Sequence, residues 1–172
     1  MKRSLLAVGV LWIVILAGVV GMKEFTLRTG KEVLLQTVPV DPRDMFRGDY
    51  VILSYPISTV DVTPFGLKGT EFSPGQEAYV LLGSEGPYSV VTGLQRRRPD
   101  PGILCIKGTV RTASPTQLIM EYGIESYFVP EGKGHALEQA RGKTMDVKAS
   151  IDKFGHAAIK TLLIGGQEVR FK

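Results

Sequence analysis

The sequence predicts a mainly β protein: an antiparallel β-barrel or sandwich-like domain with one short helix, preceded by an N-terminal transmembrane helix. Three observations lead to this prediction. An uncharged apolar stretch occupies residues 4–21. Short runs of β-branched, aromatic and aliphatic residues, separated by Gly and Pro, follow it along the chain. One of these runs, residues 145–151, alternates strictly between apolar and polar side chains, as a half-buried strand does.

The N-terminal stretch has the length and composition of a membrane anchor. Ser4 to Gly21, SLLAVGVLWIVILAGVVG, contains no charged residue. At about 1.5 Å per residue, these roughly 18 residues cover about 27 Å, close to the hydrocarbon thickness of a bilayer. We expect a helix in spite of the glycines and β-branched residues, because an unpaired backbone group in lipid costs more than poor helix propensity. The predicted division is an anchor at residues 1–21, a juxtamembrane stalk at residues 22–30 and a β domain at residues 31–172.

Two other interpretations of this stretch compete with the anchor. A cleaved signal peptide has an apolar core of about 7–15 residues and a small-residue cleavage site, whereas this run is longer and ends in Val19-Val20-Gly21. A core helix of this length is rarely apolar on all sides. Lys2 and Arg3 favour a cytoplasmic N-terminus, which would place the C-terminal domain on the extracytoplasmic side of the inner (cytoplasmic) membrane as a single-pass protein.

Strands are predicted in order along the domain from the apolar runs and their flanking turns. The expected strands lie at residues 32–40, 49–57, 77–82, 88–94, 103–112 and 117–122, followed by a C-terminal meander at 144–151, 156–164 and 168–171. Residues 58–75 contain several glycines and prolines and are predicted to form a long loop. The one short helix is expected at His135 to Arg141, where an apolar side made of alanines and a leucine would need packing to be stable.

Charge and cysteine content narrow the functional classes. The chain has 21 basic and 17 acidic residues, and without Lys2 and Arg3 the remainder has 19 against 17. A nearly balanced domain offers no electrostatic case for nucleic acid. The basic run at residues 96–98, flanked by prolines, is interpreted as an exposed loop, with contact to phosphate or a lipid headgroup as the alternative. Cys105 is the only cysteine, and its apolar neighbours predict burial.

The densest chemistry lies in residues 38–55, VPVDPRDMFRGDYVILSY. Pro42 fixes φ and Gly48 can take positive φ, so we expect a tight turn that leads into a strand. The two arginines of this segment can form forked hydrogen bonds to its aspartates. Two interpretations stay open: a charged turn that locks the entry of the strand, or a recognition site for a partner or an anionic group. Alternation along the strand places Tyr50 and Tyr55 on opposite faces.

Three blocks of this sequence resemble one known family. Residues 48–55 spell GDYxxLxY, residues 121–134 contain Tyr-Gly, Tyr-Phe and Pro-Glu-Gly, and residues 152–166 form a third block. On these residues the chain resembles the GDYXXLXY family, membrane-anchored bacterial proteins to which no biochemical activity is assigned. The resemblance implies a place in the cell envelope. It also implies a multi-pass membrane protein as partner, because family members often sit beside or are fused to such proteins.

Two functions follow as hypotheses. The first is a membrane-tethered, non-catalytic binding or assembly module. It is favoured because no nucleotide-binding loop or nucleophile motif is present, and because His135 and His156 lack companions at metal-ligand spacing. No metal or cofactor is therefore expected. The alternative is an envelope enzyme with carboxylate and arginine chemistry around Asp49 and Glu131, which requires the first two blocks to meet in one cleft. The candidate binding residues are Asp41, Arg43, Asp44, Arg47, Asp49, Tyr50, Tyr55, Tyr122, Glu125 and Glu131.

Overall fold

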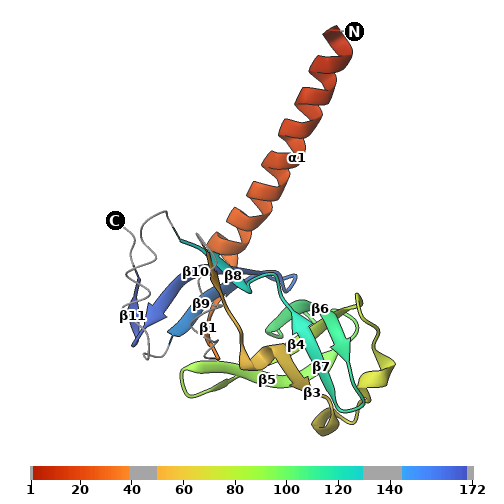
Figure 1. Cartoon of the computed structure of the whole chain (residues 1–172), viewed down its shortest axis with the longest axis vertical. Helices are drawn as coiled ribbons and strands as arrows, with labels where there is room; N and C mark the ends of the chain where they lie inside the picture. Colours follow the sequence, from red (N-terminus) through yellow and green to blue (C-terminus); the bar gives the residue numbers. More distant parts are fainter. Residues whose placement is uncertain (1, 39–49, 130–144, 170–172) are drawn as a thin grey trace.

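The structure, a computed structural model, describes residues 2–38, 50–129 and 145–169 (Figure 1). One long helix, α1 (Lys2–Thr29), projects from a domain of antiparallel strands that curve into a nearly closed, barrel-like arrangement. The prediction of a mainly β domain behind an N-terminal apolar helix is confirmed. The short helix expected at residues 135–141 lies outside the described residues.

Helix α1 has the properties of a membrane span along nearly all of its length. The segment Val8–Thr29 is long and apolar enough to cross a bilayer, and its most apolar part is not buried by the domain. Large apolar side chains such as Trp12 and Val20 are 60 % and 67 % exposed. The residues expected to form a stalk, 22–29, continue the same helix. A single straight element therefore runs from the apolar span into the domain.

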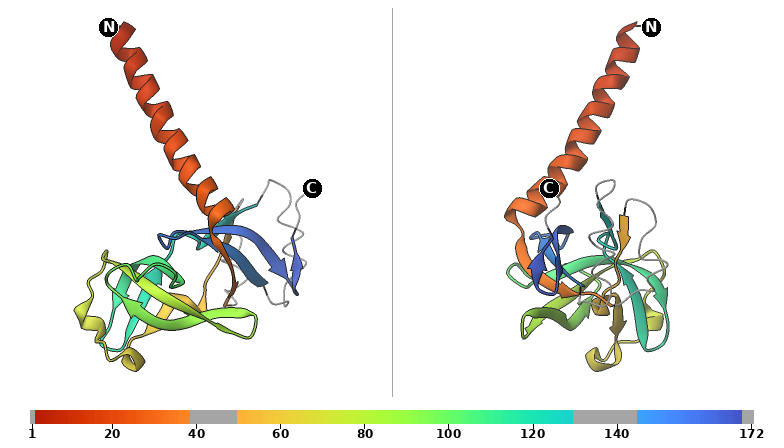
Figure 2. Two further views of the ribbon diagram at one scale, coloured as in Figure 1. Left: turned by 180° about the vertical axis from the view of Figure 1, so that it is seen from behind. Right: turned by 60° about the vertical axis from the view of Figure 1, so that its left-hand side comes forward.

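Two larger sheets and a two-stranded ribbon form the domain. The first sheet has the order β1-β9-β10-β11, with β1 (Lys31–Gln36), β9 (Met145–Ile151), β10 (Ala157–Ile164) and β11 (Gln167–Glu168). The second has the order β3-β7-β6-β4-β5, with β3 (Thr59–Asp61), β7 (Gln117–Glu121), β6 (Cys105–Ala113), β4 (Glu77–Glu85) and β5 (Tyr88–Gln95). The ribbon pairs β2 (Tyr50–Ile52) with β8 (Ser126–Phe128). Figure 2 shows the ribbon and the β9–β10 hairpin at the end of the domain from which α1 leaves.

Alternating side chains from these strands build one hydrophobic core. Val33 and Leu35 of β1, Val80 of β4 and Leu118 of β7 are all at least 94 % buried, while the side chains between them are more exposed. Backbone hydrogen bonds also connect the two larger sheets directly. One of them joins Lys107 N of β6 to Gly155 O of the β9–β10 turn at 2.8 Å. The burial of apolar surface between the sheets is the main stabilising term of such a fold.

The predicted strands are found with shifted ends, and one predicted loop is wrong. Residues 58–75 contain strand β3 and two 3₁₀ turns, Thr63–Phe65 and Gly69–Glu71. The strand was missed because it is only three residues long and buries a single side chain, Val60. Strand β8 was missed for the same reason of length, and β2 is shorter than the predicted strand at 49–57. The burial predicted for Cys105 is confirmed, at 6 % exposure.

Candidate functional site

Two buried tyrosines join the two segments that carry the family motifs. The hydroxyl of Tyr55 donates a hydrogen bond to the carbonyl of Ile124 at 2.6 Å, and the hydroxyl of Tyr122 donates to the carbonyl of Ile57 at 2.5 Å. Each tyrosine thus pairs with the backbone of the segment that holds the other. Burial, and next the charge of Glu125, raises the pKa of both hydroxyls far above the ordinary value. Both remain protonated donors at neutral pH.

Strand pairing continues this connection along the backbone. Tyr50, Val51 and Ile52 of β2 lie opposite Phe128, Tyr127 and Ser126 of β8, and Leu53 N donates to Glu125 O at 2.8 Å. The described parts of the two motif blocks, residues 50–55 and 122–129, therefore lie side by side. The predicted alternation holds for the buried face, where Val51, Leu53 and Tyr55 are each at least 96 % buried.

The carboxylate of Glu125 binds backbone amides of the turn that precedes β8. One of its oxygens accepts a hydrogen bond from Tyr122 N at 2.5 Å and the other accepts from Gly123 N at 2.8 Å. The ring of Tyr122 lies against Gly108 of β6, where an added Cβ would come within 2.7 Å of Cδ1 of that ring. A glycine is needed there because any side chain would push the tyrosine away from Ile57. This cluster is a structural seam, and we call it the tyrosine seam: Tyr55, Tyr122 and Glu125.

The candidate residues from the sequence fall into two groups. Tyr55, Tyr122 and Glu125 are brought together, and their polar atoms bind the backbone of the domain rather than facing solvent. Tyr50 lies in β2, at the start of the same ribbon. The remaining six lie outside the described residues, so their role in binding or in carboxylate and arginine chemistry stays a prediction; they are Asp41, Arg43, Asp44, Arg47, Asp49 and Glu131.

A second polar cluster, at the foot of α1, was not predicted. Thr26, near the C-terminal end of the helix, donates from its hydroxyl to Asp152 Oδ2 at 2.9 Å, and Ser150 donates from its hydroxyl to the carbonyl of Thr26 at 2.7 Å. Gly30 follows the helix and fits directly against Ser150 and Ile151, which leave no space for a Cβ. We call these contacts the helix–domain junction. Two features of the sequence lie at this junction: a threonine at the end of an apolar helix, and the turn Asp-Lys-Phe-Gly-His. Neither feature alone is specific enough to predict the contact.

Asp152 organises the β9–β10 turn as well as the junction. Its Oδ1 accepts hydrogen bonds from Phe154 N at 2.8 Å and His156 N at 3.0 Å, and His156 Nδ1 lies 3.3 Å from Oδ2. Burial raises the pKa of Asp152, but the hydrogen bonds from Thr26, Phe154 and His156 outweigh burial and hold that pKa below its ordinary value of 3.8. The carboxylate is therefore ionised at neutral pH and fully partnered.

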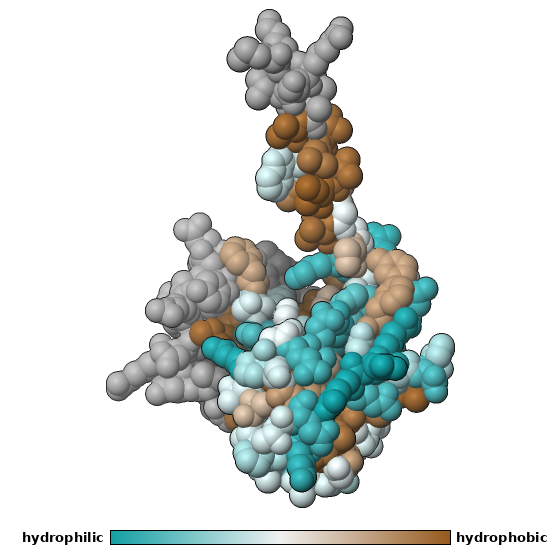
Figure 3. All heavy atoms as spheres, turned by 90° about the vertical axis from the view of Figure 1, so that its right-hand side faces the viewer, coloured by the Kyte–Doolittle hydropathy of each residue, from teal (hydrophilic) through white to brown (hydrophobic). Residues whose placement is uncertain are grey.

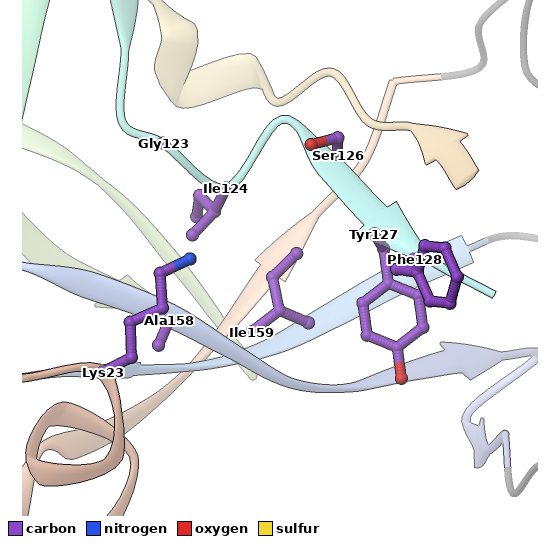
Figure 4. A pocket seen from close by; sticks show the side chains of 8 residues that line it. All are labelled: Lys23, Gly123, Ile124, Ser126, Tyr127, Phe128, Ala158 and Ile159. Carbon is purple, nitrogen blue, oxygen red and sulfur yellow. The ribbon is translucent and has the colours of Figure 1, made fainter. Parts of the chain in front are cut away.

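Hollows open beside the foot of α1, and one of them lies between the helix and the ribbon. This hollow, of about 430 Å³, is bordered by Lys23 of α1, by Gly123 to Phe128 around β8, and by Ala158 and Ile159 of β10 (Figure 4). Phe128 at its rim is 69 % exposed. Figure 3 shows the apolar helix standing over a mostly hydrophilic domain surface. Among the described residues, no group of His, Cys, Asp and Glu side chains is arranged to hold a metal ion.

Comparison with known proteins gives one match. A family model described as GDYXXLXY protein matches residues 12–162 of this chain. No curated protein and no solved structure matches. The matched range includes the apolar part of α1 from Trp12 onward, the tyrosine seam and the helix–domain junction.

Removing either seam hydroxyl is expected to destabilise the domain. Tyr55→Phe and Tyr122→Phe should each lower the free energy of unfolding by about 1–3 kcal/mol, because each leaves a buried carbonyl without its donor. Urea denaturation of the full-length protein in detergent, followed by circular dichroism, measures the change. Tyr79→Phe, the same substitution at a half-buried tyrosine of β4, is the control and should cost about 0.5 kcal/mol or less. Unchanged stability in both seam variants would contradict a structural role.

The junction is expected to respond to pH through Asp152. Because the folded-state pKa of Asp152 is lowered, its ionised form stabilises the fold above the ordinary pKa, and this contribution is lost as pH falls through the folded value. Thr26→Val should lower stability by about 1–2 kcal/mol at pH 7, and the difference from the wild type should shrink below about pH 4. Thermal melts between pH 3 and pH 7 test this. Thr29→Val, where the hydroxyl bonds only the carbonyl of Phe25, is the matched control; a pH-independent difference for Thr26→Val would argue against the role of Asp152.

Proposed function

The chain belongs to the GDYXXLXY family, and we propose that it is a membrane-tethered, non-catalytic binding module of the cell envelope whose partner is an integral membrane protein. The observation that carries the proposal is the close packing and hydrogen bonding of the helix–domain junction. Helix α1 ends at Thr29 and β1 begins at Lys31, with Gly30 packed against β9 between them. A domain held in this way keeps one height and one orientation above the bilayer that its helix would enter.

Fixed placement suits a partner that is itself fixed in the membrane. A tether to a soluble partner or substrate works best with a flexible linker, because the domain must search a volume of solution. A rigid connection restricts the domain to partners that lie beside it at one height above the bilayer. It also lowers the conformational entropy that is lost when the domain binds such a partner. Neighbouring transmembrane proteins are the class of partner that this geometry selects.

The surface around the hollow at Lys23 has the composition of a small protein-binding site. The exposed Phe128 ring, the half-buried Tyr127 and Ile159, and the ammonium of Lys23 border one concavity. Exposed aromatic side chains next to a preformed pocket are typical anchors at protein interfaces. Strands β8 and β10, which border this hollow, lie at the end of the domain from which α1 leaves (Figure 2), so a membrane-embedded partner could reach it.

The chemistry of the described residues supports binding over catalysis. Glu125 has both carboxylate oxygens bonded to backbone amides, and Tyr55 and Tyr122 use their hydroxyls as structural donors. Cys105 is buried, and burial raises the pKa of its thiol, so it is not an activated nucleophile. The alternative of an envelope enzyme therefore depends on Asp49 and Glu131, both outside the described residues.

Site-specific photocrosslinking in membranes of the source organism tests the proposal. A photoreactive amino acid at Phe128 is expected to crosslink to an integral membrane protein. The same amino acid at Ile119, an apolar position on β7 that is 37 % exposed, is the control and should give no such product. Adding a flexible six-residue Gly-Ser insertion between Thr29 and Gly30 should reduce the Phe128 product several-fold, because it uncouples the domain from the helix.

Three outcomes would contradict the proposal. Crosslinks from Phe128 to soluble proteins alone would show that the partner is not an integral membrane protein. Equal products at Phe128 and Ile119 would show random collision rather than a site. A product that survives the insertion unchanged would show that rigid placement has no part in partner binding.

A further inference from the structure

A second hollow, the largest of the three beside the foot of α1, separates the helix from the β9–β10 turn. This recess, which we call the helix–turn recess, has a volume of about 810 Å³. Its helix side is formed by residues from Gly18 to Thr26, including Val19, Met22 and Phe25. Its domain side is formed by the turn and the start of β10, including Phe154 and Ala157. Nearly all of the lining is apolar, although the recess is open to the exterior.

The recess lies at the level where the hydrocarbon of a bilayer ends. A hydrocarbon core of about 30 Å takes up about 20 helical residues, so an apolar span that begins at Ser4 ends near Lys23. Gly18 then lies about 7 Å inside the hydrocarbon edge, and Phe25 lies about 3 Å beyond it. One wall of the recess is therefore continuous with the lipid-exposed surface of α1, and lipid has direct access to it.

Cationic side chains surround the ring of Phe154 at the edge of this recess. The guanidinium carbon of Arg98 lies 4.8 Å from the ring centroid, and the ammonium of Lys153 lies 5.2 Å from it. Arg98 also donates from Nη2 to the backbone carbonyl of Lys153 at 2.5 Å, which ties the guanidinium to the turn that carries Lys153. Neither forms an ion pair with a carboxylate in the part of the chain that the structure describes.

The hollow on the far side of Phe154 adds a third cation. This hollow, of about 490 Å³, is lined by Lys31, Arg98 and Lys153, and also by Asp100 and Asp152. Asp152 is already partnered by Thr26 and by the amides of its own turn. Three cations against two carboxylates leave the surface beside the ring of Phe154 with a small net positive charge, close to the level of the headgroups.

From these observations we propose that the helix–turn recess is a binding site for one anionic phospholipid. An acyl chain of the lipid fills the apolar recess between α1 and the turn, entering from the bilayer. The phosphate lies beside Phe154, where Arg98 and Lys153 supply charge and hydrogen-bond donors. An apolar cavity joined to the bilayer, and flanked by two cations that have no carboxylate partner among the described residues, matches this ligand at both ends. The proposal requires only that α1 crosses the membrane, and it holds whether or not the domain binds a protein partner.

Fluorescence quenching in nanodiscs tests the site. Trp12, the only tryptophan of the chain, is replaced by Phe, and Phe154→Trp becomes the reporter. Nanodiscs of phosphatidylcholine contain the same mole fraction of chain-brominated lipid, either phosphatidylglycerol or phosphatidylcholine. We expect at least about twofold stronger quenching by the brominated phosphatidylglycerol, because the anionic lipid is enriched at the recess. His156→Trp, on the same turn, is a second reporter, in case the first variant does not fold.

Matched variants separate the site from general lipid contact. Arg98→Gln with Lys153→Gln should make the quenching by the two lipids equal, whereas Arg111→Gln, an exposed arginine of β6, should not. A reporter at Phe65→Trp, in the 3₁₀ turn Thr63–Phe65 at the far end of the domain (Figure 1), should be quenched by neither lipid. No quenching of either reporter on the turn would overturn the placement of the recess at the bilayer. Equal quenching by both lipids in the unsubstituted background would overturn the selectivity for an anionic lipid.

Discussion

The hydroxyl of Thr26 and the buried carboxylate of Asp152 form the contact on which the orientation of this protein depends. A helix end packed against a sheet leaves backbone carbonyls that need partners, and at this junction the carbonyl of Thr26 accepts from both the hydroxyl of Ser150 and the amide of Gly30. The same carboxylate orders the β9–β10 turn through two amide hydrogen bonds. The foot of the helix and the β9–β10 turn are thus both bound by one carboxylate. Without it, the hydrogen bond from Ser150 to the carbonyl of Thr26 would be the remaining polar side-chain contact of this junction.

The family motif has a physical explanation in the tyrosine seam. The hydroxyls of Tyr55 and Tyr122 each donate to a backbone carbonyl of the other tyrosine's segment, and the two segments are far apart in sequence. The carboxylate of Glu125 binds the backbone amides of the turn that begins at Tyr122. A phenylalanine would fill the same space but would leave a buried carbonyl unpaired. These residues position β8, and β8 borders the hollow at Lys23. In the described part of the chain, the motif therefore supports the proposed binding surface rather than forming it.

Sequence reasoning identifies those features that depend on local pattern. The apolar helix and the paired strands β4 and β5 follow from hydropathy and turn residues. The alternation in β9 locates that strand, but the prediction of a half-buried strand is wrong, because Asp146 and Ser150 on its polar face are buried as well. Strands β3 and β8 are three residues each and take their conformation from distant partners, Leu118 of β7 and Val51 of β2 among them. The helix–domain junction joins residues 126 positions apart, and the need for glycine at 108 appears only when the ring of Tyr122 is placed on it. Local propensity carries no information about such contacts, and so the candidate site at the foot of α1 could not be predicted.

The central claim is that α1 and the β domain move as one rigid body above the bilayer. Double electron–electron resonance in nanodiscs measures this directly, with spin labels at Val14, an exposed position on α1, and Glu85, at the tip of the β4–β5 hairpin, in a Cys105→Ala background. A rigid junction predicts a single narrow distance distribution that broadens when Thr26 is replaced by Val. A broad distribution in the unsubstituted protein, equal to that of a variant with a flexible Gly-Ser insertion after Thr29, would show instead that the helix is only a loose tether.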